Sequence, residues 1–96
     1  MEVRIQAIHF DASEKLQDFI QKKVAKLEKF CDDIKKVEVS LKVVKPETAM
    51  NKEAGIQLVI PTKMDLFASK VADTFEEAVD LAIDALERQL EKNKER

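Results

Sequence analysis

The chain has 96 residues, of which 45% are hydrophobic and 38% are charged, and its formal net charge is −2. This length and composition predict one folded domain with a modest core and exclude a disordered tail. The single cysteine excludes an internal disulfide, and no signal peptide is visible. No apolar stretch approaches the roughly 18 residues of a membrane span. We therefore expect a cytoplasmic protein without membrane contact.

Charge is unevenly distributed along the chain. Residues 73–96 contain eight acidic and four basic residues, a net charge of −4, whereas the preceding residues contain thirteen basic and eleven acidic residues, a net charge of +2. The acidity therefore belongs to the C-terminal segment. A slightly negative total does not exclude local basic patches that bind phosphate.

The first third of the chain predicts a strand followed by a helix. Residues 2–8 alternate in type, as expected for a strand. Asp11 and Glu14 have the spacing of a capping box, which predicts a helix from this point to about Cys31. Apolar side chains recur along that helix at three- and four-residue intervals and form one buried stripe: Leu16, Phe19, Ile20, Val24, Leu27 and Phe30.

Three more strands are predicted in the middle of the chain. Residues 37–43 have a clean period of two, residues 46–53 are polar and predict an irregular loop, and residues 56–60 alternate again. Residues 61–63 suit a tight turn, and residues 64–71 predict a fourth strand. The inward face of this last strand stays open, because two pairs of side chains fit the core equally well: Leu66 and Ala68, or Phe67 and Val71.

A second helix is predicted at the end of the chain. Asp73 and Glu76 repeat the capping-box spacing. The apolar stripe of the helix that follows consists of Phe75, Val79, Ala82, Ile83, Leu86 and Leu90. The element order β-α-β-β-β-α predicts an α+β two-layer sandwich with both helices packed on one face of a four-stranded sheet.

Residues suited to catalysis or metal binding are scarce. His9 is the only histidine and is expected to be a structural residue at a strand end, while Cys31 is expected to be a small buried hydrophobe. Gly55 is the only glycine, so the chain has no Gly-rich phosphate loop. We therefore expect no cofactor, no metal site, no small-molecule substrate and no enzymatic activity.

The first predicted helix carries a row of basic side chains. At about 100° per residue, four lysines fall within an arc of roughly 60°: Lys15, Lys22, Lys26 and Lys29. Lys23 falls inside the angular range of the apolar stripe and is expected either to extend past the edge of the core or to lie where the helix overhangs the sheet. Such a row suits a sugar-phosphate backbone. A solvated face with partial pairing to Asp18 and Glu28 explains it equally well.

The second predicted helix has a basic pair and an acidic face. Arg88 and Lys92 are four residues apart and share one side, with Lys94 beyond them, and bases in a last turn also favour the helix dipole. Another exposed face is acidic: Glu77, Asp80, Asp84, Glu87 and Glu91. If the helices pack side by side, Arg88 and Lys92 could extend the lysine row into one patch. The chain has five Phe and no Tyr or Trp, so recognition of backbone and shape is expected rather than base stacking.

Two segments resemble a known family. The run Ala-Lys-Leu-Glu-Lys-Phe at 25–30 and the run Ile-Asp-Ala-Leu-Glu-Arg-Gln-Leu-Glu-Lys-Asn-Lys at 83–94 are similar to the ribosome hibernation-promoting factors, also called ribosome-associated inhibitors and formerly sigma-54 modulation proteins. The resemblance covers essentially the whole chain. The chain departs from the usual family pattern at Glu76, where Tyr is common, and at Ala85, where Lys is common.

This resemblance implies a fold similar to double-stranded-RNA-binding domains and a partner, the small ribosomal subunit with its rRNA. It implies binding in the mRNA/tRNA channel near the decoding site and steric inhibition of translation in stationary or starved cells. By position, it implies RNA contacts from Lys22, Lys23, Lys26, Lys29, Arg88, Lys92 and Lys94. The length resembles the short form, a single ribosome-binding domain over 1–96 without a C-terminal dimerisation domain, so pairing of ribosomes would require another factor.

Two other interpretations of the residues stay open. The chain could be a general structured-RNA-binding module without a preference for ribosomes. It could also be a protein–protein interaction domain that uses its sheet face or its acidic second helix.

Overall fold

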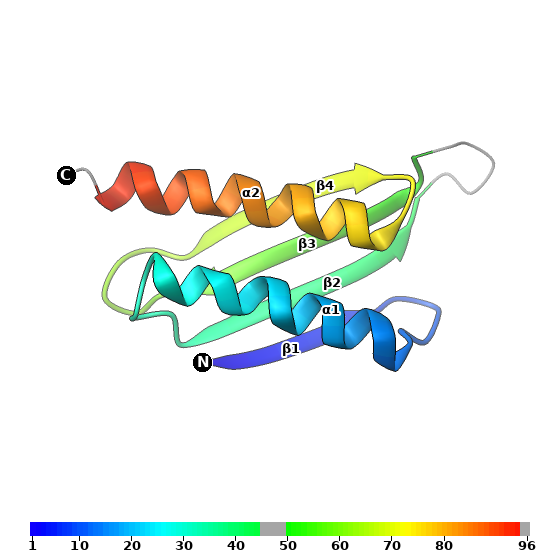
Figure 1. Ribbon diagram of the computed structural model, residues 1–96, viewed down its shortest axis with the longest axis horizontal. Helices are drawn as coiled ribbons and strands as arrows, with labels where there is room; N and C mark the ends of the chain where they lie inside the picture. Colours follow the sequence, from blue (N-terminus) through cyan, green and yellow to red (C-terminus); the bar gives the residue numbers. More distant parts are fainter. Residues whose placement is uncertain (45–49, 95–96) are drawn as a thin grey trace.

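Two helices cover one face of a four-stranded sheet in the computed structural model (Figure 1). The structure describes residues 1–44 and 50–94, and for residues 93 and 94 it describes the backbone alone. The elements follow the predicted order β-α-β-β-β-α, with a short 3₁₀ helix, η1, directly after the first α-helix. Their bounds are β1 Glu2–Ala7, α1 Glu14–Ala25, η1 Lys26–Lys29, β2 Lys36–Val43, β3 Lys52–Val59, β4 Leu66–Ala72 and α2 Phe75–Lys94.

The sheet is mixed, with the strands in sequence order. β1 pairs with β2 in parallel, placing Val3 opposite Val37, because α1 carries the chain back across the sheet between them. β2, β3 and β4 form an antiparallel meander, in which Val37 faces Leu58 and Leu58 faces Leu66. The predicted two-layer sandwich is therefore confirmed, and no helix among the described residues covers the second face of the sheet.

The core lies between the sheet and the two helices. The predicted apolar stripes supply it: Ile20, Val24 and Leu27 from α1 and η1, and Val79 and Leu86 from α2, are each fully buried. The strands contribute the side chains at alternate positions, as a period of two requires. The structure describes no buried polar or charged residue, so packing of apolar side chains holds the two layers together.

The ambiguous fourth strand faces the core with its smaller side chains. Leu66 and Ala68 are each 7% exposed, whereas Phe67 is 59% exposed on the open face. β4 is paired with β3 on one side, with Leu66 opposite Leu58 and Ala68 opposite Ile56, and its inner face packs against α2. The largest apolar residue of the strand is therefore the one left in solvent.

The loop predicted over residues 46–53 is shorter than expected. Lys52 and Glu53 belong to β3, where they pair with Val43 and Lys42 of β2, and residues 46–49 lie outside the described part of the chain. Cross-strand pairing extends the hairpin beyond the apolar alternation, and the Lys42–Glu53 ion pair at 3.5 Å contributes to that extension.

Both helices begin later than the capping boxes predicted. The Oγ of Ser13, not a carboxylate of Asp11, accepts a hydrogen bond from the backbone N–H of Leu16 at 3.1 Å. In the same way, Oγ1 of Thr74 accepts from the N–H of Glu77 at 3.1 Å. Asp73 instead accepts a hydrogen bond from the N–H of Met50 at 2.8 Å and so fixes the chain where it enters β3. The capping predictions at Asp11 and Asp73 were therefore wrong.

Replacement of Ser13 by Ala is expected to lower the free energy of unfolding by about 0.5–2 kcal/mol, because an N–H in the first turn of α1 loses its acceptor. The matched control is Asp11→Ala, expected to change stability by less than about 0.5 kcal/mol. Urea denaturation followed by circular dichroism measures both. A larger loss for Asp11→Ala than for Ser13→Ala would restore the capping box inferred from sequence.

Candidate nucleic-acid interface

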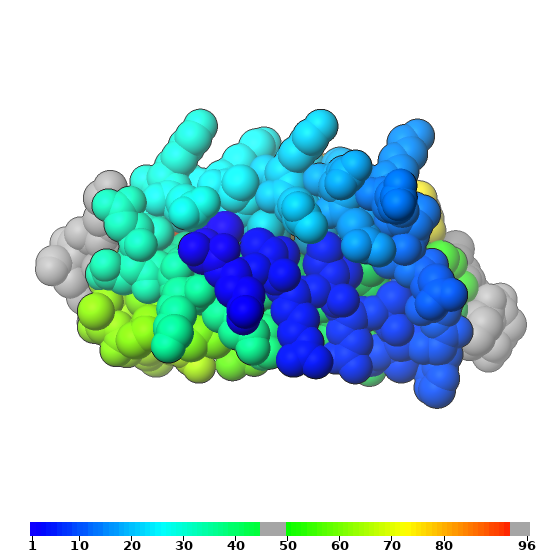
Figure 2. Space-filling view, turned by 90° about the horizontal axis from the view of Figure 1, so that it is seen from below, coloured from blue at the N-terminus to red at the C-terminus, as the bar shows by residue number. Residues whose placement is uncertain are grey.

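The predicted lysine row lies on the outer surface of α1 and η1. Lys15, Lys22, Lys26 and Lys29 are all exposed, and in the described part of the chain none of them forms an ion pair with a carboxylate. Figure 2 shows long side chains of this helical segment standing out from the molecule on the side opposite the open sheet face. The row therefore presents several cations directly to solvent.

The change from α-helix to 3₁₀ helix alters the end of this row. The helix winds more tightly from Lys26 to Lys29, at three residues per turn instead of 3.6. Side chains three residues apart eclipse one another in that geometry, so Lys26 and Lys29 lie one above the other rather than about 60° apart. The tightening concentrates positive charge at the C-terminal end of the first helical segment.

Lys23 behaves differently from the other lysines, as its position inside the apolar stripe predicted. Its side chain is 27% exposed, passes over the ring of Phe19, and places Nζ 3.0 Å from Oδ1 of Asp80 on α2. The hydrogen bond and the negative charge of Asp80 raise the pKa of Lys23, with a smaller contribution from the charge of Asp84. Lys23 thus joins the two helices and is already neutralised by α2.

This ion pair shows which side of α2 faces α1, in a helix whose rotation is set by its buried stripe, including Val79 and Leu86. Viewed down the axis of α2, the side chain of Arg88 is rotated by about 80° from that of Asp80, and the side chain of Lys92 by about 120°. Arg88 therefore projects from the outer surface of the helix, and Lys92 projects toward the flank that faces away from α1. Both are exposed, and Nε of Arg88 donates to the backbone carbonyl of Asp84 at 3.4 Å. The side chain of Lys94 lies outside the described part of the chain.

The structure therefore brings the predicted residues together only in part. The helices do pack side by side, and both run toward the same end of the molecule (Figure 1). Their cations form two basic strips rather than one continuous patch, because Asp80 and Asp84 lie between them. Sequence analysis placed Asp80 on a solvent-facing acidic side. The signal for its true role was Lys23, a cation within an apolar arc that required a partner.

The other polar residues that the sequence singled out form no second centre. Cys31 is buried, and His9 lies exposed beyond the end of β1 with a positive φ of 67°. Within the described residues no group of three or more metal-ligating side chains comes together. None of the helices in that part of the chain is both long and apolar enough to cross a membrane.

Comparison with known proteins identifies relatives of the whole chain. The family model described as "Sigma 54 modulation protein / S30EA ribosomal protein" matches residues 3–96. A protein of Pseudomonas putida named ribosome hibernation promoting factor is 33% identical over 96 residues, which are all of this chain and 89% of the relative. A protein of the same name from Azotobacter vinelandii is 30% identical over 96 residues, covering 85% of its length.

Solved structures share the fold at lower sequence identity. A ribosomal subunit interface protein from Coxiella burnetii superposes with a TM-score of 0.87 at 23% identity, over the full length of both chains. The N-terminal domain of Protein Y from Thermus thermophilus superposes with a TM-score of 0.81 at 22% identity, over 96% of this chain and 98% of that one. The arrangement of two helices on a four-stranded sheet thus recurs in both structures.

Proposed function

This chain belongs to the Sigma 54 modulation protein / S30EA ribosomal protein family, and from that premise we propose that it is a ribosome hibernation factor. It binds the small ribosomal subunit and its rRNA in the mRNA/tRNA channel near the decoding site. There it blocks translation sterically in the cytoplasm of stationary or starved cells, and no bond is made or broken. The name of its relatives in Pseudomonas putida and Azotobacter vinelandii supports this proposal.

One observation in the structure carries the proposal: a surface row of lysines with no carboxylate partner among the described residues, on a molecule whose net charge is slightly negative. An unpaired ammonium group on a flexible stem contacts a phosphate oxygen without demanding a particular base. Each such contact releases condensed counterions from the RNA, which makes binding favourable at low and physiological salt. Lys22, Lys26 and Lys29 form the centre of this surface, with Arg88 and Lys92 as a second strip.

The proposed function requires no cofactor, because the protein inhibits by occupying the channel and is held there by charge. The helical layer supplies the phosphate contacts, and the thickness of the two-layer sandwich fills the channel. Lys23 forms a contact between α1 and α2 in this scheme rather than a phosphate contact, since its ammonium group is held by Asp80.

Binding to purified vacant small subunits is expected to weaken steeply as salt rises. Five phosphate contacts, from Lys22, Lys26, Lys29, Arg88 and Lys92, predict a slope of about −4 in a plot of log affinity against log salt concentration. Co-sedimentation over a series of potassium chloride concentrations measures it. A flat profile would contradict phosphate binding. Displacement by equal amounts of plain duplex RNA would support a general structured-RNA module instead.

Replacement of Asp80 by Asn is expected to raise the affinity for small subunits about 2- to 5-fold, because it frees Lys23 for one further phosphate contact and removes a negative charge between the basic strips. The control is Glu2→Gln, which makes the same change in charge on the open face of the sheet and should leave affinity unchanged. Co-sedimentation at near-physiological salt compares them, and equal gains for both variants would show an effect of net charge alone.

A further inference from the structure

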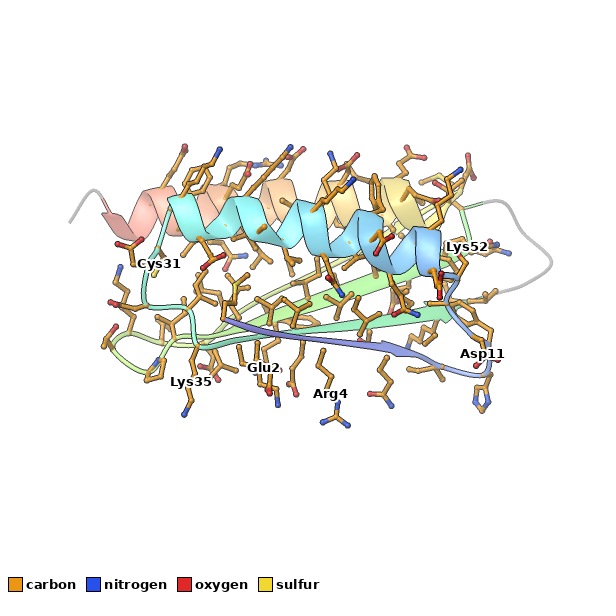
Figure 3. The ribbon with its side chains drawn as sticks, turned by 60° about the horizontal axis from the view of Figure 1, so that its bottom comes forward. Glu2, Arg4, Asp11, Cys31, Lys35 and Lys52 are labelled. Atoms are coloured by element: carbon orange, nitrogen blue, oxygen red, sulfur yellow. The ribbon has the colours of Figure 1, made fainter. Side chains whose placement is uncertain are left out.

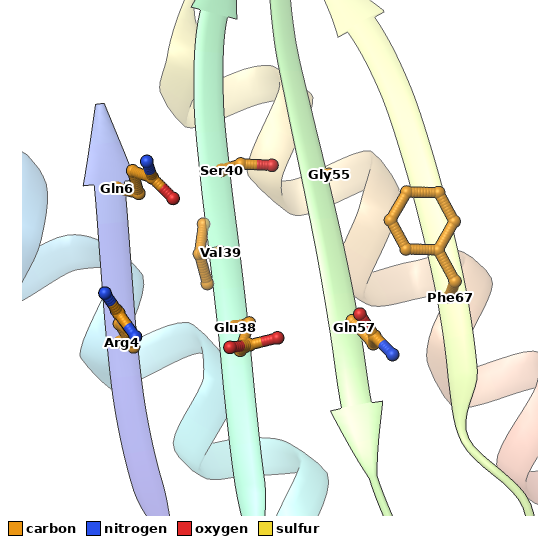
Figure 4. A pocket seen from close by; sticks show the side chains of 8 residues that line it. All are labelled: Arg4, Gln6, Glu38, Val39, Ser40, Gly55, Gln57 and Phe67. Atoms are coloured by element: carbon orange, nitrogen blue, oxygen red, sulfur yellow. The ribbon is translucent and has the colours of Figure 1, made fainter. Parts of the chain in front are cut away.

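The face of the sheet opposite the helices contains a shallow hollow centred on Gly55. Its volume is about 240 Å³, and its floor and rim come from all four strands (Figure 4). This is smaller than the roughly 300–1,000 Å³ of pockets that enclose whole small molecules. The hollow therefore suits one planar ring rather than a complete ligand.

Strand register explains why the hollow forms at this point. Cross-strand pairing places Gln6, Ser40, Gly55 and Ser69 in one row, in which Gly55 has no side chain and two neighbours are serines. The adjacent row has the long side chains Arg4, Glu38, Gln57 and Phe67. A row of short residues beside a row of long ones leaves a depression with walls on one side.

The wall at β4 is an aromatic ring. Phe67 leans toward β3, so that a Cβ built on Gly55 would lie 3.3 Å from Cζ of its ring, and its side chain is still 59% exposed. The other four Phe residues are partly buried and pack against the core. Gln89 on α2 donates to the backbone carbonyl of Phe67 at 3.3 Å, which holds this part of the edge strand in place. The protein thus presents one fixed aromatic face to solvent.

The opposite side of the hollow carries an unpaired cation. Glu38 lies directly across from Arg4, but its carboxylate binds Nζ of Lys36 at 3.2 Å, and the same Nζ lies 4.0 Å from Glu2. Lys42 and Glu53 pair with each other. Of the described charges in this face of the sheet, the guanidinium of Arg4 is the one without an opposite charge in ion-pair contact. Figure 3 shows it pointing away from the helices into solvent.

We propose that this hollow binds one unpaired nucleotide of single-stranded RNA. The base stacks on Phe67, and the phosphate lies toward Arg4. The Ser40 hydroxyl offers a donor and an acceptor to the edge of the base, and Gln57, whose Nε2 donates to Oδ2 of Asp65 at 3.4 Å, offers its amide oxygen. An exposed ring on a sheet is an effective platform for any base, because every base has a π-face. One unpaired cation and one exposed ring match the phosphate and the base of a nucleotide, whereas an acidic peptide would use the cation alone.

This inference does not rest on the ribosomal function of the helices, because the two surfaces lie on opposite faces of the molecule. It also revises an expectation from sequence. The few aromatic residues argued against base stacking, but that argument did not anticipate that one of them would face solvent.

Fluorescence can test the site directly, because the chain contains no Trp or Tyr. Phe67→Trp adds a single fluorophore at the stacking position, and Met64→Trp adds one at an exposed position that does not line the hollow. We expect a short oligouridylate to quench Phe67→Trp saturably and to leave Met64→Trp unquenched. The matched RNA duplex and a poly-glutamate peptide should quench neither variant.

Two further variants assign the parts of the site. Arg4→Gln in the Phe67→Trp background is expected to weaken binding roughly 5-fold, as the loss of one phosphate contact requires. With a labelled oligouridylate, Phe67→Leu should weaken binding roughly 5- to 100-fold, while Phe67→Tyr should bind like the parent protein. The second comparison is made with Lys22, Lys26 and Lys29 replaced by Gln, so that the helical surface does not hold the probe.

The outcomes separate this site from the proposed function. Saturable quenching that persists when those three Lys→Gln changes abolish ribosome binding supports the sheet site independently. Absence of saturable quenching, equal quenching of Met64→Trp, or no effect of Arg4→Gln overturns it. Equal quenching by poly-glutamate would also overturn it, and would assign the face to an acidic protein partner.

Discussion

Reversal of Lys22, Lys26 and Lys29 to Glu in one variant is expected to abolish co-sedimentation with vacant small subunits. All three are exposed and form no ion pair among the described residues, so the change removes three phosphate contacts and leaves the fold intact. Each lost contact weakens binding about 5-fold at near-physiological salt, so the three together predict a fall of about 100-fold before repulsion is added. The slope against log salt should also become less steep by about 3.

The control for this variant changes the same charge elsewhere. Lys35, Lys63 and Lys70 are also exposed and outside any ion pair in the described residues, and their reversal likewise takes the formal net charge from −2 to −8, a change of −6. If the lysine row on α1 and η1 is the contact surface, this control should lose far less affinity. Equal losses in the two triple variants would mean that net charge, and not the row, governs binding.

Truncation of Leu86 to Ala is expected to lower the free energy of unfolding by about 2–5 kcal/mol. Leu86 is 0% exposed in the middle of α2, where that helix packs against β3 and β4. Removal of the side chain loses its burial and leaves a cavity that the surrounding residues fill only in part. Because a domain of this size has a total stability of about 5–15 kcal/mol, the variant should be close to unfolding at elevated temperature.

Leu81→Ala makes the same chemical change on the same helix. Its side chain is 39% exposed on the outer surface, so the loss should stay below about 1 kcal/mol. Urea denaturation measured by circular dichroism gives both values, with an unchanged dependence on denaturant. Similar losses for Leu81→Ala and Leu86→Ala would contradict the packing of α2 described above.

Much of the fold follows from periodicity alone. Residues 37–43 alternate so regularly that only one face can be buried, and the stripe through Ile20 and Val24 admits one orientation of α1. The inward face of the fourth strand could not be predicted in this way, because Phe67 and Leu66 are both large and apolar. The register with β3 places Leu66 opposite the buried Leu58 and Phe67 opposite Gln57, and a residue pattern within one strand does not contain that information.

Helix starts were predictable in kind but not in position. Ser13 and Thr74 each stand directly before the first helical residue, and Thr74 with Glu77 also has the spacing of a capping box. Asp11 and Asp73, which precede these residues by two positions and one position, also have an acidic residue three positions further on. The capping-box spacing alone therefore did not identify the capping residue. The carboxylate of Asp73 instead accepts a hydrogen bond from the backbone N–H of Met50. These residues are 23 positions apart, so the local sequence does not reveal this contact.

The candidate interface shows a similar limit. The exposure of Lys22, Lys26 and Lys29 followed from their angles around one helix. The separation of Arg88 from that row did not, because helical angles say nothing about the rotation of one helix relative to another. The contact between Lys23 and Asp80 reveals that rotation in the structure, and acids lie where a continuous patch had been considered.

Because α1 and α2 run parallel to each other, charge is distributed unevenly along the molecule. Their first turns carry Glu14, Glu76 and Glu77 at one end, while Lys22, Lys29 and Lys92 lie toward the other. These full charges run opposite to the helix dipoles, whose ends carry only about half a charge each, so the side chains set the direction of the field along the longest axis. In the field of a polyanion, such a body experiences a torque before it makes any contact. In the proposed function, the lysine-bearing end therefore leads the approach to RNA, although the total charge would by itself keep the protein away.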